Sequence, residues 1–217
     1  MGLFDTILGR TRAARPDLDA LFALPGAALT LEASAGLVPS GRAGVCFRAP
    51  AGKPFEELEV EVESLLGLAD TDPTTSGDPP APAQTVRHVA DSFGYRWIVI
   101  EGGGIDDLVT RAHLVHSSLE DAGWGPQLLC SVFGFHPGRD PGADPDALGP
   151  EGMAPDQPLF LVYLAKRGTF YPFAPSGPEE RDSELELRIR GVLGKDLPVE
   201  EDLSRWFPLW DLPLTGP

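Results

Sequence analysis

Residues 95–123, YRWIVIEGGGIDDLVTRAHLVHSSLEDAG, decide the fold class of this 217-residue chain. The apolar run over 95–101 predicts a strand, and the three glycines that follow predict a turn into a helix. That helix is expected over 105–122, because its apolar residues recur on one face at intervals of three and four, and Gly123 is a typical helix stop. Residues 85–91 predict a strand that pairs with the first across Phe93-Gly94. The stretch therefore predicts a strand–strand–helix unit.

Similar elements are predicted on both sides of this unit. Before it, we expect strands over 28–32 and 44–48, separated by Gly36, Pro39 and Gly41, and then a helix over 53–66. The alternating residues 57–63 leave a strand open as the alternative. After it, we expect strands over 128–135, 159–165 and 169–173, a helix over 183–193 with a capping box at Ser183 and Glu186, and a helical tail over 202–210. The order ββα–ββα–βββα predicts an α+β fold with a mostly antiparallel sheet and helices packed on it.

The chain is expected to form one domain with an N-terminal extension. Residues 1–16 make the extension and residues 17–217 the α+β domain, with acidic, proline-rich loops at about 70–84 and 136–158. These loops hold too few apolar side chains to offset the entropy of ordering them. We therefore expect them to be flexible and at the surface.

The net negative charge of the chain limits the kinds of molecule that it is expected to bind. Lys and Arg number 17 against 33 Asp and Glu, so the net charge is −16 and nucleic acid is not expected as a partner. No apolar run approaches the roughly 20 residues of a transmembrane helix, and the N-terminus lacks the features of a signal peptide. We expect a cytoplasmic protein that could also lie peripherally at the inner membrane.

Three groups of residues raise the question of catalysis or ligand binding. The glycines 102–104 before a helix could cradle a phosphate, but the acids around them favour a plain turn. His113 and His116 are spaced to share a metal, yet no third ligand stands at a readable spacing, so histidines in or beside the core are expected. Cys46 and Cys130 lie in apolar runs and are expected to be buried. The sequence therefore predicts no catalytic residue, no metal site and no cofactor.

Two segments favour contact with other macromolecules. The N-terminal helix predicted over 2–10 places four apolar residues on one side, and three arginines follow, as in helices that lie on membranes or in a partner's groove. The candidate docking residues are Leu3, Phe4, Ile7, Leu8, Arg10, Arg12 and Arg15. A second candidate partner surface combines cations with aromatic residues: Lys166, Arg167, Phe170, Tyr171, Phe173, Trp206 and Trp210. For both segments, packing on the protein's own domain is the alternative.

Long strings of the sequence resemble a known family. They are GLFD at 2–5, LGR at 8–10, DLDALFALP at 17–25, DSFGY at 91–95, SLEDAG at 118–123, GPQLLC at 125–130, residues 166–175 and RWFP at 205–208. They are similar to the actinobacterial PspA-associated family PspAB. The resemblance implies an accessory component of the phage-shock response to envelope stress, whose central protein PspA coats the inner membrane. It also implies a genomic association with an HtpX-like membrane zinc protease.

These observations together predict a non-enzymatic adaptor that acts by protein–protein contact, with weak docking on the membrane surface. Its partner would be PspA or the membrane protease, as the resemblance implies. The alternative is a small-ligand-binding protein or an enzyme with a site near His113, His116 and Cys130, or a regulator of the protease.

Overall fold

A six-stranded antiparallel sheet in the order β2-β3-β1-β4-β5-β6 forms the centre of the computed structural model, which describes residues 18–48, 85–138, 153–154 and 156–215. The strands are β1 (Leu37–Phe47), β2 (Thr85–Ala90), β3 (Arg96–Glu101), β4 (Leu128–Pro137), β5 (Leu159–Leu164) and β6 (Thr169–Phe173). A separate ribbon pairs β7 (Pro175–Gly177) with β8 (Glu180–Arg181). The predicted α+β class with a mostly antiparallel sheet is confirmed.

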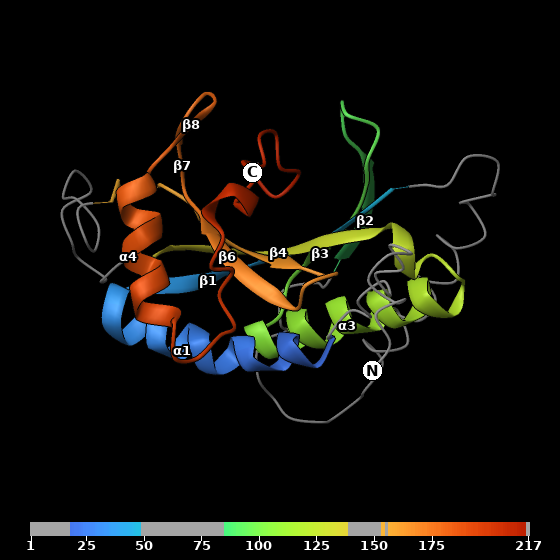
Figure 1. Ribbon diagram of the computed structural model, residues 1–217, viewed down its shortest axis with the longest axis horizontal. Helices are drawn as coiled ribbons and strands as arrows, with labels where there is room; N and C mark the ends of the chain where they lie inside the picture. Colours follow the sequence, from blue (N-terminus) through green and yellow to red (C-terminus); the bar gives the residue numbers. More distant parts are fainter. Residues whose placement is uncertain (1–17, 49–84, 139–152, 155, 216–217) are drawn as a thin grey trace, which may run out of the picture.

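The helices of the described residues pack on one face and at one end of this sheet (Figure 1). They are α1 (Leu24–Ala35), α3 (Ile105–Asp121) and α4 (Ser183–Leu193), with the short 3-10 turns η1 (Leu18–Ala23) and η2 (Gly125–Gln127). A further 3-10 turn, η4 (Leu203–Arg205), belongs to the C-terminal tail. The strand–strand–helix unit β2-β3-α3 begins and ends within one or two residues of its prediction. Its helix buries Leu108, Val109, Ala112, Val115 and Leu119, which confirms the predicted apolar face.

The strand predicted over 28–32 is wrong, because these residues belong to α1. Pro25 stands in the first turn of the helix, where a missing N–H does no harm, and Gly36 ends it in the left-handed conformation at φ 59°. The side chains that α1 buries are Leu24, Ala27, Ala28, Leu31 and Ala35, a helical spacing. The first predicted ββα unit is therefore absent.

Strand β1 is longer than predicted. The turn expected at Pro39 and Gly41 lies inside the strand, where the pairing with β4 shifts register between Pro39 and Ala43. Proline, which has no N–H to donate, is tolerated at such a bulge, and Gly41 adopts the positive φ of 73° that the bulge requires.

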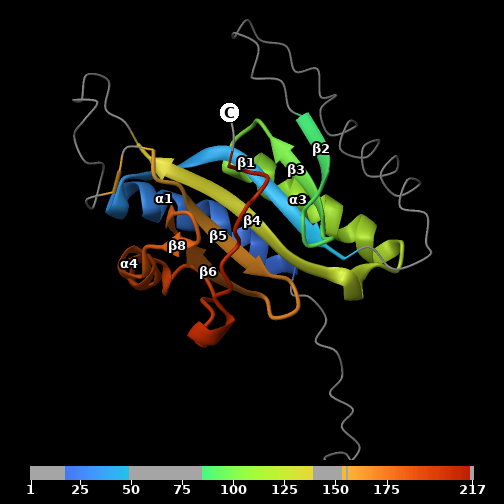
Figure 2. The ribbon, with the colours of Figure 1, turned by 90° about the horizontal axis from the view of Figure 1, so that it is seen from above.

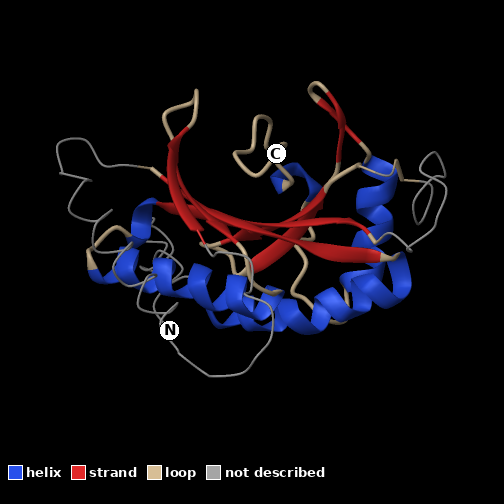
Figure 3. Cartoon of the chain, turned by 180° about the vertical axis from the view of Figure 1, so that it is seen from behind, coloured by secondary structure: helices blue, strands red, loops and turns tan. Residues whose placement is uncertain are grey.

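The sheet separates two layers of buried side chains. On the helix side, residues such as Val45 and Phe133 join the larger core with the helices. On the opposite side, their strand neighbours Cys46 and Val132 belong to a second layer, which the C-terminal tail completes with Leu214. Figures 2 and 3 show this tail crossing the face that the helices leave open.

The tail is mostly irregular, so the helix predicted over 202–210 is wrong apart from the single turn η4. Residues Pro208 and Pro213 cannot continue a helical hydrogen-bond ladder. The loop predicted from His136 begins later, because His136 and Pro137 close β4. The helix predicted over 53–66, the loop at 70–84 and the extension at 1–16 lie outside the described residues.

Candidate functional site

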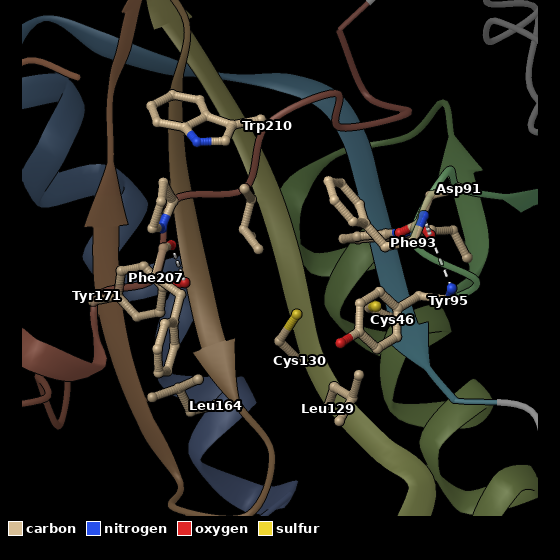
Figure 4. A pocket seen from close by; sticks show the side chains of 13 residues that line it. Cys46, Asp91, Phe93, Tyr95, Leu129, Cys130, Leu164, Tyr171, Phe207 and Trp210 are labelled. Atoms are coloured by element: carbon tan, nitrogen blue, oxygen red, sulfur yellow. Dashed lines mark hydrogen bonds between the residues drawn. The ribbon is translucent and has the colours of Figure 1, made fainter. Parts of the chain in front are cut away.

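An apolar groove opens on the sheet face opposite the helices, with a volume of about 520 Å³. Its walls come from β1, β3 to β6, the turn between β2 and β3, and the tail (Figure 4). The lining residues are Cys46, Asp91, Phe93, Tyr95, Trp97, Leu129, Cys130, Leu164, Tyr171, Phe207, Pro208, Leu209 and Trp210. Six of these are aromatic, and such side chains dominate the energetics of binding surfaces.

The side chain of Asp91 fixes one wall of the groove. Its Oδ1 atom accepts hydrogen bonds from the backbone N–H groups of Phe93 at 2.9 Å and Tyr95 at 2.8 Å, and its Oδ2 atom accepts from Trp97 Nε1 at 3.0 Å. Gly94 takes the left-handed φ of 83° that this tight turn needs. These bonds fix the backbone of the turn, and Phe93 at the rim is 68% exposed.

The tail forms the opposite wall and is anchored by an ion pair between a partly buried arginine and a buried carboxylate. Arg181 donates from Nε to Glu186 at 2.9 Å, and from Nη1 to the carbonyl oxygen of Trp206 at 2.7 Å. Glu186 is 2% exposed and also accepts from the N–H of Ala174 at 2.9 Å. The Tyr171 hydroxyl donates to the carbonyl oxygen of Phe207 at 2.9 Å. The wall is thus held at both Trp206 and Phe207.

Aromatic contacts complete this wall. The indole of Trp206 stacks on the ring of Tyr171 with the centroids 6.0 Å apart, and its Nε1 atom donates to the carbonyl oxygen of Glu200 at 3.0 Å. Trp210 meets the ring of Phe173 edge-on at 5.3 Å. Phe207 next to them is 59% exposed.

The two cysteines lie on the floor of the groove. Cys46 and Cys130 are direct partners in the antiparallel pair β1–β4, and both thiols are free. The hydrogen bond with Cys130 and burial raise the pKa of the Cys46 thiol above its ordinary value. Both cysteines are buried, as predicted.

His116 lies on the other side of the sheet. Its Nε2 atom is 2.6 Å from the hydroxyl of Ser131, and its ring stacks on Tyr163 in the helix-side core. Because successive strand residues point to opposite faces, Ser131 turns toward the helix while Cys130 turns away from it. His113 contacts the ring of Phe22 at 4.9 Å. His113, His116 and Cys130 therefore do not come together. The predicted alternative, a site near these three residues, is wrong.

The histidines do not form a metal site within the described part of the chain, where no group of three or more His, Cys, Asp and Glu side chains has a suitable arrangement. Burial lowers the pKa of His116 to about 3, with the charge of His113 as a smaller cause. The imidazole is thus neutral at physiological pH and belongs to the core, as predicted.

The glycines 102–104 form a turn, as predicted. Gly102 and Gly103 have φ values of 86° and 83°, in the region that favours glycine. The Oδ2 atom of Asp107 accepts from the N–H of Gly104 at 3.0 Å, so a carboxylate already occupies the start of α3. The carboxylate would repel a phosphate at this position, which supports the predicted turn over a phosphate site.

Most of the predicted aromatic partner surface is buried. Phe170, Tyr171, Phe173 and Trp206 are at most 5% exposed, so the surface prediction is wrong for them and the core alternative is right. In the hairpin β5–β6, Phe170 turns toward the helices and contacts Tyr163, while its neighbours turn toward the tail.

The remaining residues of the predicted aromatic partner surface differ in how exposed they are. Lys166 and Arg167 are exposed at the hairpin turn, and Trp210 is half-buried in the groove. Arg167 pairs with the buried carboxylate of Glu200, which also accepts from the Thr169 hydroxyl at 3.0 Å. The docking residues Leu3, Phe4, Ile7, Leu8, Arg10, Arg12 and Arg15 lie outside the described residues.

No pattern in the sequence predicts the groove itself. Its rim residues Phe93, Leu129, Leu164 and Phe207 stand in four different segments, and no pattern in any one of them signals that they meet. The string RWFP at 205–208 is the strongest local hint of a binding surface, because it places two aromatic residues beside a proline in an acidic tail.

Comparisons with known proteins agree with the resemblance seen in the sequence. Searches of curated proteins and of solved structures gave no match. No helix among the described residues is both long enough and apolar enough to cross a bilayer. The family model for PspAB, PspA associated protein B, matches residues 1–214, almost the full length. The chain therefore belongs to the PspA associated protein B family.

Proposed function

We propose that the chain is a non-enzymatic accessory protein of the PspA-linked envelope-stress response, and that it binds PspA through the apolar groove. The family match supports the association with PspA. The groove is the observation that best supports action by binding. It offers aromatic contact area on an open face, and it has few polar groups able to transform a substrate.

Two polar side chains of the groove, those of Asp91 and Tyr171, are engaged in holding the structure. Asp91 accepts three hydrogen bonds from the turn and from Trp97, and Tyr171 donates to the tail. The raised pKa of Cys46 keeps its thiol protonated, whereas a nucleophilic cysteine needs a lowered one. These features support binding over catalysis.

The shape of the groove and the charge of the chain favour a protein partner. Phe93 and Phe207 stand on opposite walls and each residue is more than half exposed, so the pair can hold an apolar side chain between them. The net charge of −16 favours a partner surface that surrounds this apolar anchor with Lys and Arg. We expect PspA to present such a segment.

We also propose that the N-terminal extension docks weakly on the membrane surface. In this proposal Leu3, Phe4, Ile7 and Leu8 dock weakly on anionic lipid, with Arg10, Arg12 and Arg15 adding electrostatic attraction. Co-sedimentation with anionic liposomes would compare the full chain with a form lacking residues 2–15. Equal, negligible binding by both forms would remove the membrane contact and leave the groove proposal intact.

The test of the groove is the affinity of the purified full-length chain for purified PspA by isothermal titration calorimetry. The double variant Phe93→Ser/Phe207→Ser removes the two rim rings, and we expect the Kd to rise at least about tenfold, as for the loss of interface hot spots. Circular dichroism would check that the variant is folded.

The matched control is Leu29→Ser on the outer side of α1, where the side chain is 69% exposed and far from the groove. This variant should bind PspA like the parent chain. Equal affinity of the groove variant and the control would disprove the groove as the contact surface. Binding to an HtpX-like protease, but not to PspA, would instead identify the chain as a protease regulator.

A further inference from the structure

The chain contains two cysteines, far apart in sequence, and the fold places them directly opposite each other. Cys46 on β1 and Cys130 on β4 are Cα partners in an antiparallel pair. In such pairs the Cα atoms are about 4.5 or 5.5 Å apart, inside the range of about 4.4–6.8 Å that disulfides span. The side chains of directly opposed residues also lie on the same face of the sheet.

The backbone beside the pair can adjust. The register of β1 against β4 shifts between Cys46 and Phe47, which marks an irregularity next to the cysteine. Regular cross-strand Cβ atoms are about 4.5–5.5 Å apart, whereas a disulfide needs about 3.5–4.5 Å. A local shift of about 1 Å closes this gap, at a point where the ladder is already disrupted and the strand bent.

Both thiols face a space that small molecules can enter. Cys46 and Cys130 line the groove, and Figure 4 shows their sulfur atoms between the turn at Phe93 and the wall that carries Phe207. They are 4% and 7% exposed, so a bulky reagent is excluded while a small one can approach. The negative charge of the chain does not repel an uncharged molecule.

We propose that Cys46 and Cys130 are a redox-active dithiol that hydrogen peroxide converts into a cross-strand disulfide. Cys130, the more exposed of the two, attacks one peroxide oxygen and the O–O bond breaks. The departing hydroxide takes the Cys130 thiol proton, so a sulfenic acid and one water form. The Cys46 sulfur then attacks the Cys130 sulfur. The S–S bond forms while the sulfenic hydroxyl leaves with the Cys46 proton as a second water. Two electrons pass from the thiols to the peroxide, and a reducing thiol reverses the change.

The raised pKa of Cys46 predicts a slow reaction of the two thiols with peroxide. A protonated thiol is a weak nucleophile, so the pair should react more slowly than an exposed cysteine. Oxidation should therefore need sustained peroxide. This modification is independent of the proposed binding to PspA, since it requires only the pairing of β1 with β4.

The test uses the full-length reduced protein, treated with hydrogen peroxide over a time course and then unfolded and alkylated. We expect loss of both free thiols and an intact mass lower by two hydrogen atoms, with a linked peptide pair that contains both cysteines. Dithiothreitol should restore the thiols. The variants Cys46→Ser and Cys130→Ser serve as controls and should form no intramolecular link.

Three results would overturn the proposal. The first is full alkylation of both thiols after prolonged treatment, and the second is a mass gain by added oxygen atoms without a linked peptide. The third is disulfide-linked dimers as the main product. Each readout comes from the wild-type chain, so the conclusion does not depend on whether a variant folds, nor on whether PspA binds.

Discussion

The Nε2 atom of His116 lies 2.6 Å from the Oγ atom of Ser131, across the interface between α3 and β4. Both residues have no exposed surface, and the imidazole also stacks on Tyr163. A polar pair thus joins the helix to the central strand in the middle of an apolar core. Because burial penalises the imidazolium, the pKa of His116 falls to about 3 from an ordinary value of 6.5.

This shift predicts how the stability of the protein depends on pH. The folded state binds the proton less well than the unfolded state, so the contribution of His116 is complete above pH 6.5 and is lost as the pH falls toward 3. Between pH 7 and 5 the loss should be about 2 kcal/mol of unfolding free energy. Urea denaturation at the two pH values measures it. The variant His116→Gln should lose much less over the same interval; an equal loss would show that other groups cause the acid sensitivity.

The ion pair between Arg181 and Glu186 predicts a second effect on stability. Arg181→Ala would leave the carboxylate of Glu186 buried without its charged partner and would release the carbonyl of Trp206. We expect a loss of about 3 kcal/mol in unfolding free energy, the scale for breaking a buried pair. The control is Arg205→Ala, whose pair with Asp202 is about half exposed and should contribute little to stability. Similar losses in the two variants would contradict a structural role for the buried pair.

The elements that could be predicted from the sequence are those whose local pattern and tertiary role agree. In α3 the apolar spacing, the glycine turn before it and Gly123 after it all indicate the same helix. In α1 the short run 28–32 alternates like a strand, and only the longer window from Leu21 to Ala35 shows helical spacing. The burial of Glu186 could not be predicted from a capping motif, because the cap is made by Asp182 and Glu186 instead meets Arg181.

The groove depends on contacts between distant segments, which no local pattern records. Phe170 and Tyr171 are neighbours in one aromatic run, yet they lie on opposite faces of the sheet, one toward the helices and the other toward the tail. Cys46 and Cys130 meet only because β1 and β4 pair in one particular register. The sequence could therefore predict buried cysteines, but not the juxtaposition of the thiols or the exposed rings above them.

The hydroxyl of Tyr171 predicts a specific effect on the wall of the groove. Tyr171→Phe keeps the ring that stacks on Trp206 and removes only the hydrogen bond to the carbonyl oxygen of Phe207. We expect a loss of about 1 kcal/mol in unfolding free energy and faster hydrogen–deuterium exchange at the backbone amides of Leu209 and Trp210. The matched control is Tyr95→Phe on the opposite wall, whose hydroxyl has no hydrogen bond among the described residues. If exchange in the tail rose equally in the two variants, or in neither, the bond from Tyr171 would not be what holds this wall in place.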